Sequence, residues 1–155
     1  MTTAAEHVLD IARDLFAALV DGEPGHVAEW GGAGVDLTEP VHAWVDITCA
    51  HPLRATVTTD RGTAADIARA LLALAPDEAV TSEDAEDALG EMANVIGGNL
   101  KGLVARSAAL TVPVVARGPV ETAGRRAWER RLRWRDRPVV ISMWQLDPEG
   151  KEQTP

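Results

Sequence analysis

One long helix with a single apolar side limits the folds open to this chain. Residues 83–106 are predicted to form it, because Thr81 and Asp84 at its start are spaced as in a capping box. With each residue turned by about 100°, the apolar side chains of its central part fall within about 60° of one direction. This stripe consists of Leu89, Met92, Ala93, Ile96, Leu100 and Leu103. It predicts a side of the helix that faces the core.

Strands are predicted on both sides of this helix in the sequence. In residues 41–50 polar and apolar side chains alternate, which is typical of a strand with one buried face. A β-rich run over 54–59 follows a turn. Residues 110–116 have the β-branched composition of a strand, which Pro113 interrupts at an edge or a bulge. We expect a hairpin near the C-terminus, with strands 127–135 and 139–146.

Two shorter helices complete the predicted elements. The first has apolar side chains at helical spacing and ends at Asp21-Gly22; its stripe is Val8, Ile11, Ala12, Leu15, Phe16 and Leu19. The second covers 64–74, with Thr63 as its N-cap. Residues 22–40 are rich in glycine and are expected to form a loop that Trp30 anchors. The mixed order of helices and strands favours a soluble α/β or α+β domain.

The length of 155 residues and the mass of 16.5 kDa predict one domain, which we place at 1–146, followed by a polar tail at 147–155. The single cysteine, Cys49, excludes an intrachain disulfide and favours a reducing compartment. No apolar run approaches the roughly 20 residues of a membrane helix. The N-terminal segment has no basic region of the kind that begins a signal peptide. We therefore expect a cytoplasmic location and no membrane partner.

Charge is distributed unevenly along the chain. The formal net charge is −9, yet residues 1–100 carry −14 and residues 101–155 carry +5. Seven arginines lie between 125 and 137. They predict either an outward charged face that discourages edge-to-edge aggregation or a docking surface for an acidic partner, including the acidic half of a second copy. Nucleic acid stacked on Trp128 or Trp134 is a less favoured alternative, because the chain as a whole is acidic.

The side of the long helix opposite the apolar stripe is polar. Asp87, Glu91, Asn94 and Gly98 fall at roughly 140–200° on the same projection. A solvated face is the ordinary explanation for such a pattern. However, asparagine is a poor residue inside a helix, and Gly97-Gly98 together cost about 2 kcal/mol of helix propensity. These costs indicate that the face serves another purpose, such as the close approach of a partner.

Other chemistries have little support. The four histidines lie in the first third of the chain, and no HxH, HExxH or CxxC spacing occurs, so no metal site is expected. His42, Trp44 and Asp46 share one face of the strand 41–50, which we interpret as a half-buried sheet face. Motifs of serine hydrolases and of P-loop nucleotide-binding proteins are absent from the sequence.

The polar face carries a recognisable motif. The pattern Asp87-x3-Glu91-x2-Asn94, continued to Asn99 as Asn-Val-Ile-Gly-Gly-Asn, resembles the signature of the CheC/CheX/FliY family of chemotaxis phosphatases. Residues 110–115 resemble the proline-bearing strand that follows this helix in the family. The motif occurs once, as is usual in the CheX branch. The 18 residues between Asn94 and Pro113 are fewer than in the usual family pattern.

This resemblance implies an α+β fold in which a twisted, mostly antiparallel sheet packs against long helices. It also implies hydrolysis of the aspartyl phosphate of a phosphorylated CheY-like response regulator, with Mg²⁺ held by that regulator and no cofactor in this chain. Homodimers are common in the CheX branch, and the strand-rich C-terminal part offers a sheet edge for one. The alternative is a non-catalytic domain of the same fold that only binds the regulator or serves as a scaffold.

The resemblance also assigns roles to individual residues. Asn94 is expected to orient the attacking water, because a neutral carboxamide binds water without repelling phosphoryl oxygens. Glu91 is expected to pair with the active-site lysine of the regulator and so fix its register. The remaining residues of the motif, expected to bind the partner, are Asp87, Gly98 and Asn99.

Overall fold

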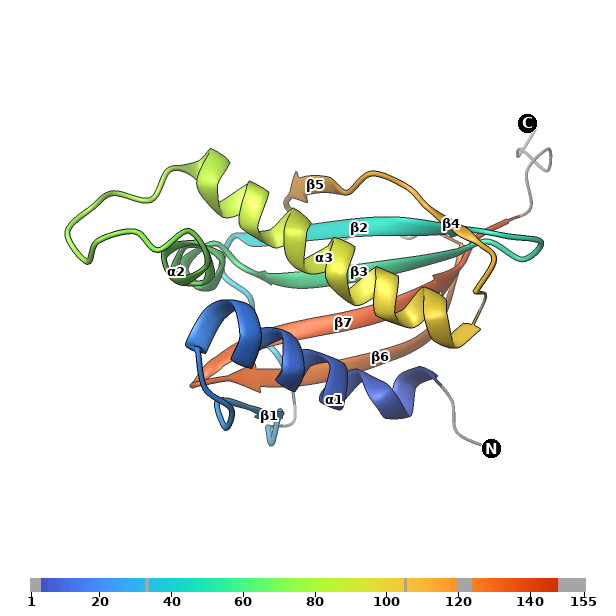
Figure 1. Ribbon diagram of the computed structural model, residues 1–155, viewed down its shortest axis with the longest axis horizontal. Coiled ribbons are helices and arrows are strands. Elements are labelled where there is room, and N and C mark those ends of the chain that lie inside the picture. Colours follow the sequence, from blue (N-terminus) through green and yellow to red (C-terminus); the bar gives the residue numbers. More distant parts are fainter. Residues whose placement is uncertain (1–3, 33, 105, 120–123, 148–155) are drawn as a thin grey trace.

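The computed structural model describes residues 4–32, 34–104, 106–119 and 124–147, so most of the predicted polar tail lies outside the described residues. A seven-stranded antiparallel sheet has its helices on one face (Figure 1). The helices are α1 (Ala4–Phe16), continued by the π-helical turn η1 (Ala17–Asp21), α2 (Arg61–Leu71) and α3 (Ser82–Val104). The strands are β1 (Val27–Glu29), β2 (Pro40–Thr48), β3 (Leu53–Asp60), β4 (Ala109–Leu110), β5 (Val114–Arg117), β6 (Arg125–Trp134) and β7 (Arg137–Gln145). The architecture is the α+β class that the family resemblance implied.

The strand order places the segment after α3 at one edge of the sheet. The order is β1-β6-β7-β3-β2-β4, and β5 also pairs with β2. Strands β4 and β5 therefore share the outer edge of β2, with Leu110 opposite Ile47 and Val114 opposite Trp44. Pro113 lies between them, which confirms the predicted interruption.

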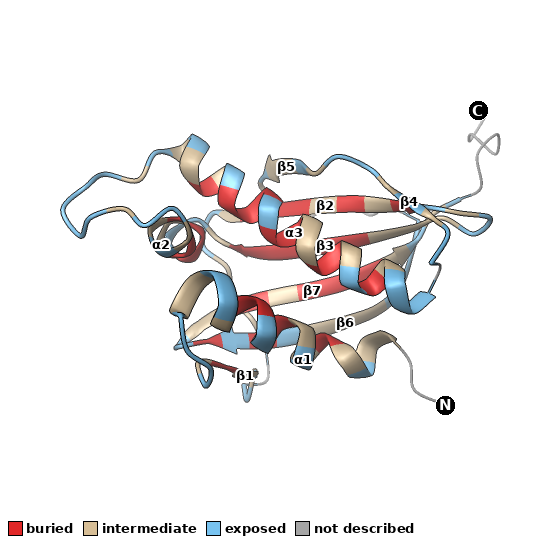
Figure 2. Ribbon diagram, in the orientation of Figure 1, coloured by how far each residue is buried: buried red, intermediate tan, exposed pale blue. Residues whose placement is uncertain are grey.

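The core lies between the sheet and the helices. Figure 2 shows buried residues along the sides of α1 and α3 that face the strands. On β2, Ala43, Val45 and Ile47 are fully buried, as the alternating pattern predicted. Met92 and Ile96 on α3 are equally buried. Packing of this apolar layer fixes the side of α3 that faces solvent.

Several details of the sequence interpretation were wrong. The segment predicted as a loop over 22–40 contains β1, a short strand that pairs with the end of β6. Helix α2 is capped by Asp60, which accepts a hydrogen bond from Thr63 N at 2.8 Å, so Thr63 is inside the helix rather than at its N-cap. Leu103 is 49% exposed, because the last turn of α3 is not covered as its central turns are.

In the described part of the chain, no helix is long and apolar enough to span a membrane.

Most of the C-terminal hairpin is paired with other strands, so it has less open sheet edge than the sequence suggested. Strand β7 lies inside the sheet between β6 and β3, and β1 pairs with β6 over 132–134. Trp30 N extends this contact by donating to Arg131 O at 3.0 Å. Among the described residues of this hairpin, only the first part of β6 therefore has an open edge, and a homodimer through it stays a prediction.

Most arginines of this hairpin pair with acids of the same chain. Arg126 and Arg131 both contact Glu129 at 2.9 Å. The other three pairs join the hairpin to the N-terminal half: Arg130 with Glu29, Arg135 with Asp21 at 2.8 Å, and Arg137 with Asp66 at 2.7 Å. The basic cluster is thus largely neutralised internally. This arrangement favours the charged-face interpretation over a site for nucleic acid.

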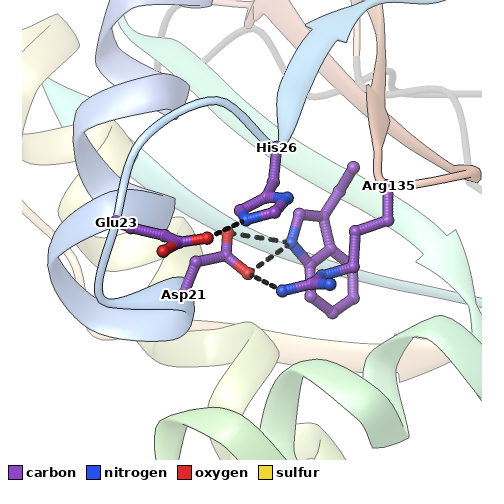
Figure 3. A network of polar contacts seen from close by, with 5 residues as sticks. Asp21, Glu23, His26 and Arg135 are labelled. Atoms are coloured by element: carbon purple, nitrogen blue, oxygen red, sulfur yellow. Dashed lines mark hydrogen bonds and ion pairs between the residues drawn. The ribbon is translucent and has the colours of Figure 1, made fainter.

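Asp21 is the most buried acid of these pairs. Its side chain is only 2% exposed, and its carboxylate accepts hydrogen bonds from Arg135 and from Trp134 Nε1 at 3.1 Å. Figure 3 shows Asp21 beside Arg135, with the Glu23–His26 contact of 2.8 Å next to them. The backbone adds Arg135 N donating to His26 O at 2.8 Å. These contacts fasten the turn of the β6–β7 hairpin to the end of η1.

Candidate functional site

The start of α3 is fixed by the predicted capping box. Thr81 Oγ1 accepts a hydrogen bond from Asp84 N at 3.0 Å, and Thr81 N donates to Asp84 Oδ2 at 3.1 Å. A second contact ties the helix to the sheet edge, where Arg117 of β5 donates to Glu86 at 2.6 and 2.9 Å. Both contacts confine the helix before the motif residues begin.

Two glycines of α3 face the strands, and at one of them the close approach of the helix requires glycine. A Cβ atom added at Gly97 would overlap Val45 Cγ2 of β2. One added at Gly90 would lie 3.4 Å from Val115 Cγ2 and 3.6 Å from Pro113 Cβ. Gly97 is buried, so the expectation that Gly97-Gly98 lies on an exposed face was wrong for its first residue. Close contact with the sheet therefore offsets the cost in helix propensity at Gly97.

The opposite side of α3 presents the motif to solvent. Asp87 and Glu91 are exposed and Asn94 is half-buried. Their spacing of four and three residues places the three side chains along one face, about one turn apart. Within the described part of the chain, none of these side chains makes a hydrogen bond or an ion pair. The structure therefore brings together the predicted carboxylates and carboxamide with their polar atoms available.

The other two motif residues lie differently. Gly98 is half-buried, and a Cβ added there would lie 4.0 Å from Leu110 Cδ2. Asn99 is exposed, but its position five residues after Asn94 turns it about 140° away around the helix. Its amide donates to Val95 O at 2.8 Å. Asn99 thus shares the helix with Asn94 without sharing its face.

The face of α3 that carries Asp87, Glu91 and Asn94, called the motif face below, is a surface rather than a pocket. A cavity of about 300 Å³ lies near the start of α3, where Glu39, Arg61, Glu86 and Arg117 are among its lining residues, and it includes neither Glu91 nor Asn94. No group of residues suited to hold a metal ion occurs in the described ranges. Glu91 and Asn94 therefore lie on an open surface outside this cavity.

The other predicted polar face, on β2, is half-buried on the side of the sheet away from the helices (Figure 1). His42 is buried and its ring stacks on Trp44 with centroids 5.5 Å apart. The Arg54 guanidinium lies 5.0 Å from the centre of the Trp44 ring and donates two hydrogen bonds to Asp46, at 2.7 and 3.0 Å. The polar residues of this strand thus contact one another and Arg54 on the side of the sheet away from the helices.

The segment between β4 and β5 adds a residue that the sequence interpretation missed. Val112 is 81% exposed, and the strand-like composition of residues 110–116 does not distinguish it from its less exposed apolar neighbours. Its position is a consequence of the interruption at Pro113, where the chain leaves β4 and has not yet entered β5.

Comparison with protein families gives one match. The family model described as chemotaxis phosphatase CheX matches residues 41–127, which include α3 and the two edge strands after it. No curated protein gives a significant match.

Solved structures of the same fold agree with this match. A chemotaxis protein CheX from Vibrio vulnificus is 18% identical, with a TM-score of 0.70 over 92% of this chain and 96% of that chain. A complex of CheX with CheY, BeF3 and Mg²⁺ from Borrelia burgdorferi is 18% identical, with a TM-score of 0.69 over 95% and 100%. A putative chemotaxis protein from Desulfovibrio vulgaris Hildenborough is 16% identical, with a TM-score of 0.67 over 90% and 94%.

Proposed function

The chain belongs to the CheX family of chemotaxis phosphatases, and from this membership we propose that it accelerates dephosphorylation of a CheY-like response regulator. One observation of the site supports the proposal above others. Glu91 and Asn94 lie one turn apart on the solvent side of α3, and no other described residue engages their polar atoms. The structure of a similar CheX in complex with CheY, BeF3 and Mg²⁺ supports the same class of partner.

Asn94 is proposed to position the attacking water. An acyl phosphate is already activated, and a divalent cation on the regulator would neutralise the charge that develops on the phosphoryl oxygens. The remaining requirement is a water molecule in line with the phosphorus. The carboxamide of Asn94 can hold that water through its oxygen or its amide group without repelling the phosphoryl group. Positioning of this kind can lower a barrier by several kcal/mol.

Glu91 is proposed to set the register of the partner. Its carboxylate is exposed one turn before Asn94 and can accept a charge-assisted hydrogen bond from a lysine at the regulator's active site. A carboxylate in direct contact with the phosphate would be repelled, so Glu91 acts beside the reacting group rather than on it. Asp87 would add a weaker attraction one further turn away. A cytoplasmic location follows from the proposal, since the regulator is a cytoplasmic partner.

The test is a measurement of phosphoryl lifetime. A purified regulator is phosphorylated in Mg²⁺, and its loss of phosphate is followed with and without this protein. We expect the wild-type protein to shorten the lifetime and the Asn94→Ala variant to bind the regulator without shortening it. Binding of the wild type without any acceleration would identify the protein as a regulator-binding or scaffold domain. Absence of both binding and acceleration with the cognate regulator would contradict the proposal.

A further inference from the structure

Val112 stands out from the other apolar side chains on the surface. It is 81% exposed, whereas the remaining large apolar residues that are exposed in the described ranges have values from 42% to 49%. A single exposed valine is ordinary on a protein surface and is not evidence by itself. Its position beside the motif face makes it informative.

The segment that carries Val112 runs along α3 in the opposite direction. Pro113 and Val115 lie near Gly90, and Leu110 lies near Gly97 and Gly98. Asn94 is one turn from Gly90 and less than one turn from Gly97, so it lies level with the part of the segment between Leu110 and Pro113. Val112 therefore lies at the sheet edge, level with Asn94 along α3, and most of its side chain is exposed.

The segment is held firmly at both ends of Val112. On one side, Thr111 N donates to Asp46 O at 3.0 Å and Thr111 Oγ1 accepts from Asp46 N at 2.8 Å. On the other side, β5 pairs with β2 over residues 114–117. Arg117 then ties β5 to Glu86 on α3. Val112 is thus exposed on a braced loop, so a partner could bury it without first ordering the chain.

We propose that Val112 is an apolar anchor that seats the phosphorylated receiver domain against Glu91 and Asn94. The inference rests on the proposed function, because it takes the same partner and the same docking face. Exposed polar side chains alone give a weak interface, since exposed ion pairs contribute little. An apolar contact at the rim of the partner's acidic, Mg²⁺-containing pocket would add affinity through burial and would shield the reacting water.

Val114 provides a matched control in the same segment. It is 47% exposed and pairs with Trp44, whose ring lies on the face of the sheet away from α3. The two valines therefore share their chemistry and differ in position, since Val114 is paired in β5 and Val112 lies in the unpaired stretch between β4 and β5. Val112→Ala should raise the KM for the phosphorylated regulator about three- to tenfold and leave kcat within about twofold. Val114→Ala should leave both parameters within about twofold of wild type.

The experiment combines steady-state dephosphorylation with binding of the regulator in the presence of BeF3 and Mg²⁺. Val112→Asp is included because a charge at this position should weaken binding more than alanine does, and thermal unfolding checks that each variant folds. If Val112→Ala and Val114→Ala behave alike, Val112 is not an anchor, even if the wild-type protein is active. If the wild-type protein neither binds the regulator nor shortens its phosphoryl lifetime, the proposed function itself fails.

Discussion

The β6–β7 hairpin and the outer face of α3 differ in whether their polar groups are paired within the chain. Five of the seven arginines between 125 and 137 pair with acids of the same chain. On α3, by contrast, Asp87, Glu91 and Asn94 lie on a regular helix with no partner among the described residues. The charges of the hairpin stabilise the fold, whereas the polar groups on the outer face of α3 make no contact with other described residues.

This difference explains the uneven charge of the sequence. The acidic N-terminal part and the basic C-terminal part meet in the folded chain, where Asp21, Glu29 and Asp66 receive arginines of the hairpin. The acids on the outer face of α3 receive none. Neither the net charge nor its distribution along the chain therefore indicates where a partner docks. A better guide is whether each charged group is paired within the fold.

The largest effect is expected at the helix face. Asn94→Asp preserves the shape of the side chain and adds a negative charge next to the phosphoryl oxygens. We expect kcat to fall about 100-fold or more, which corresponds to about 3 kcal/mol of transition-state stabilisation. Thermal unfolding should show unchanged stability, because the Asn94 side chain has no partner in the described chain. An active Asn94→Asp variant would contradict the water-positioning role.

The hairpin should show the reverse behaviour. Asp21→Ala leaves the buried Trp134 Nε1 without its acceptor and Arg135 without its carboxylate. Loss of such an acceptor should lower the free energy of unfolding by about 1–3 kcal/mol. Chemical denaturation measures this change, and phosphatase activity per folded molecule should stay near the wild-type value. Loss of activity at temperatures where the variant is folded would show that the two regions are coupled.

A smaller effect is expected when Glu91 loses its charge. Glu91→Gln keeps the size of the side chain but replaces a charge-assisted hydrogen bond by a neutral one. The KM for the phosphorylated regulator should rise about tenfold. Asp87→Asn, one turn further from Asn94, serves as the control and should change KM by less. Addition of salt should reduce the difference between Glu91→Gln and the wild type, because it screens the exposed carboxylate.

The smallest effect is expected at an exposed pair of the hairpin. Arg126 and Glu129 form a surface contact at 2.9 Å, and Glu129 retains Arg131 when Arg126 is replaced. Arg126→Gln should therefore change the free energy of unfolding by no more than about 1 kcal/mol. Binding of the regulator should not change at all. Weaker regulator binding by this variant would show that the basic hairpin takes part in docking.

Patterns that repeat locally could be predicted from the sequence. The alternation of residues 41–50, the capping box at Thr81 and the position of Pro113 at an interruption are confirmed. The exposure of Asp87 and Glu91 agrees with the helix projection, whereas Asn94 on the same face is half-buried. Each of these features depends on neighbours within a few residues, so the sequence itself contains the information.

The remaining features depend on residues far apart in the chain. Strand β1 is only three residues long and is defined by pairing with β6, more than 100 residues later. Gly97 appeared to belong to the exposed face, because the sequence does not show that Val45 approaches it. No local sequence pattern predicts that Val112 is exposed. Its exposure results from how β4 and β5 divide the edge of β2.

The contact at Gly97 also sets how far Asn94 reaches. At Gly90 and Gly97 the helix contributes no side chain of its own, so its backbone lies against Val45 of β2 and against Pro113 and Val115 after β4. Glu91 and Asn94 lie between these two points of contact, and the packing of the helix backbone on these side chains sets the distance from the sheet to the carboxamide. A side chain added at Gly97 would push the helix away from the strands or tilt its axis. Asn94 would then be displaced relative to a docked partner, although every residue of the motif would remain present.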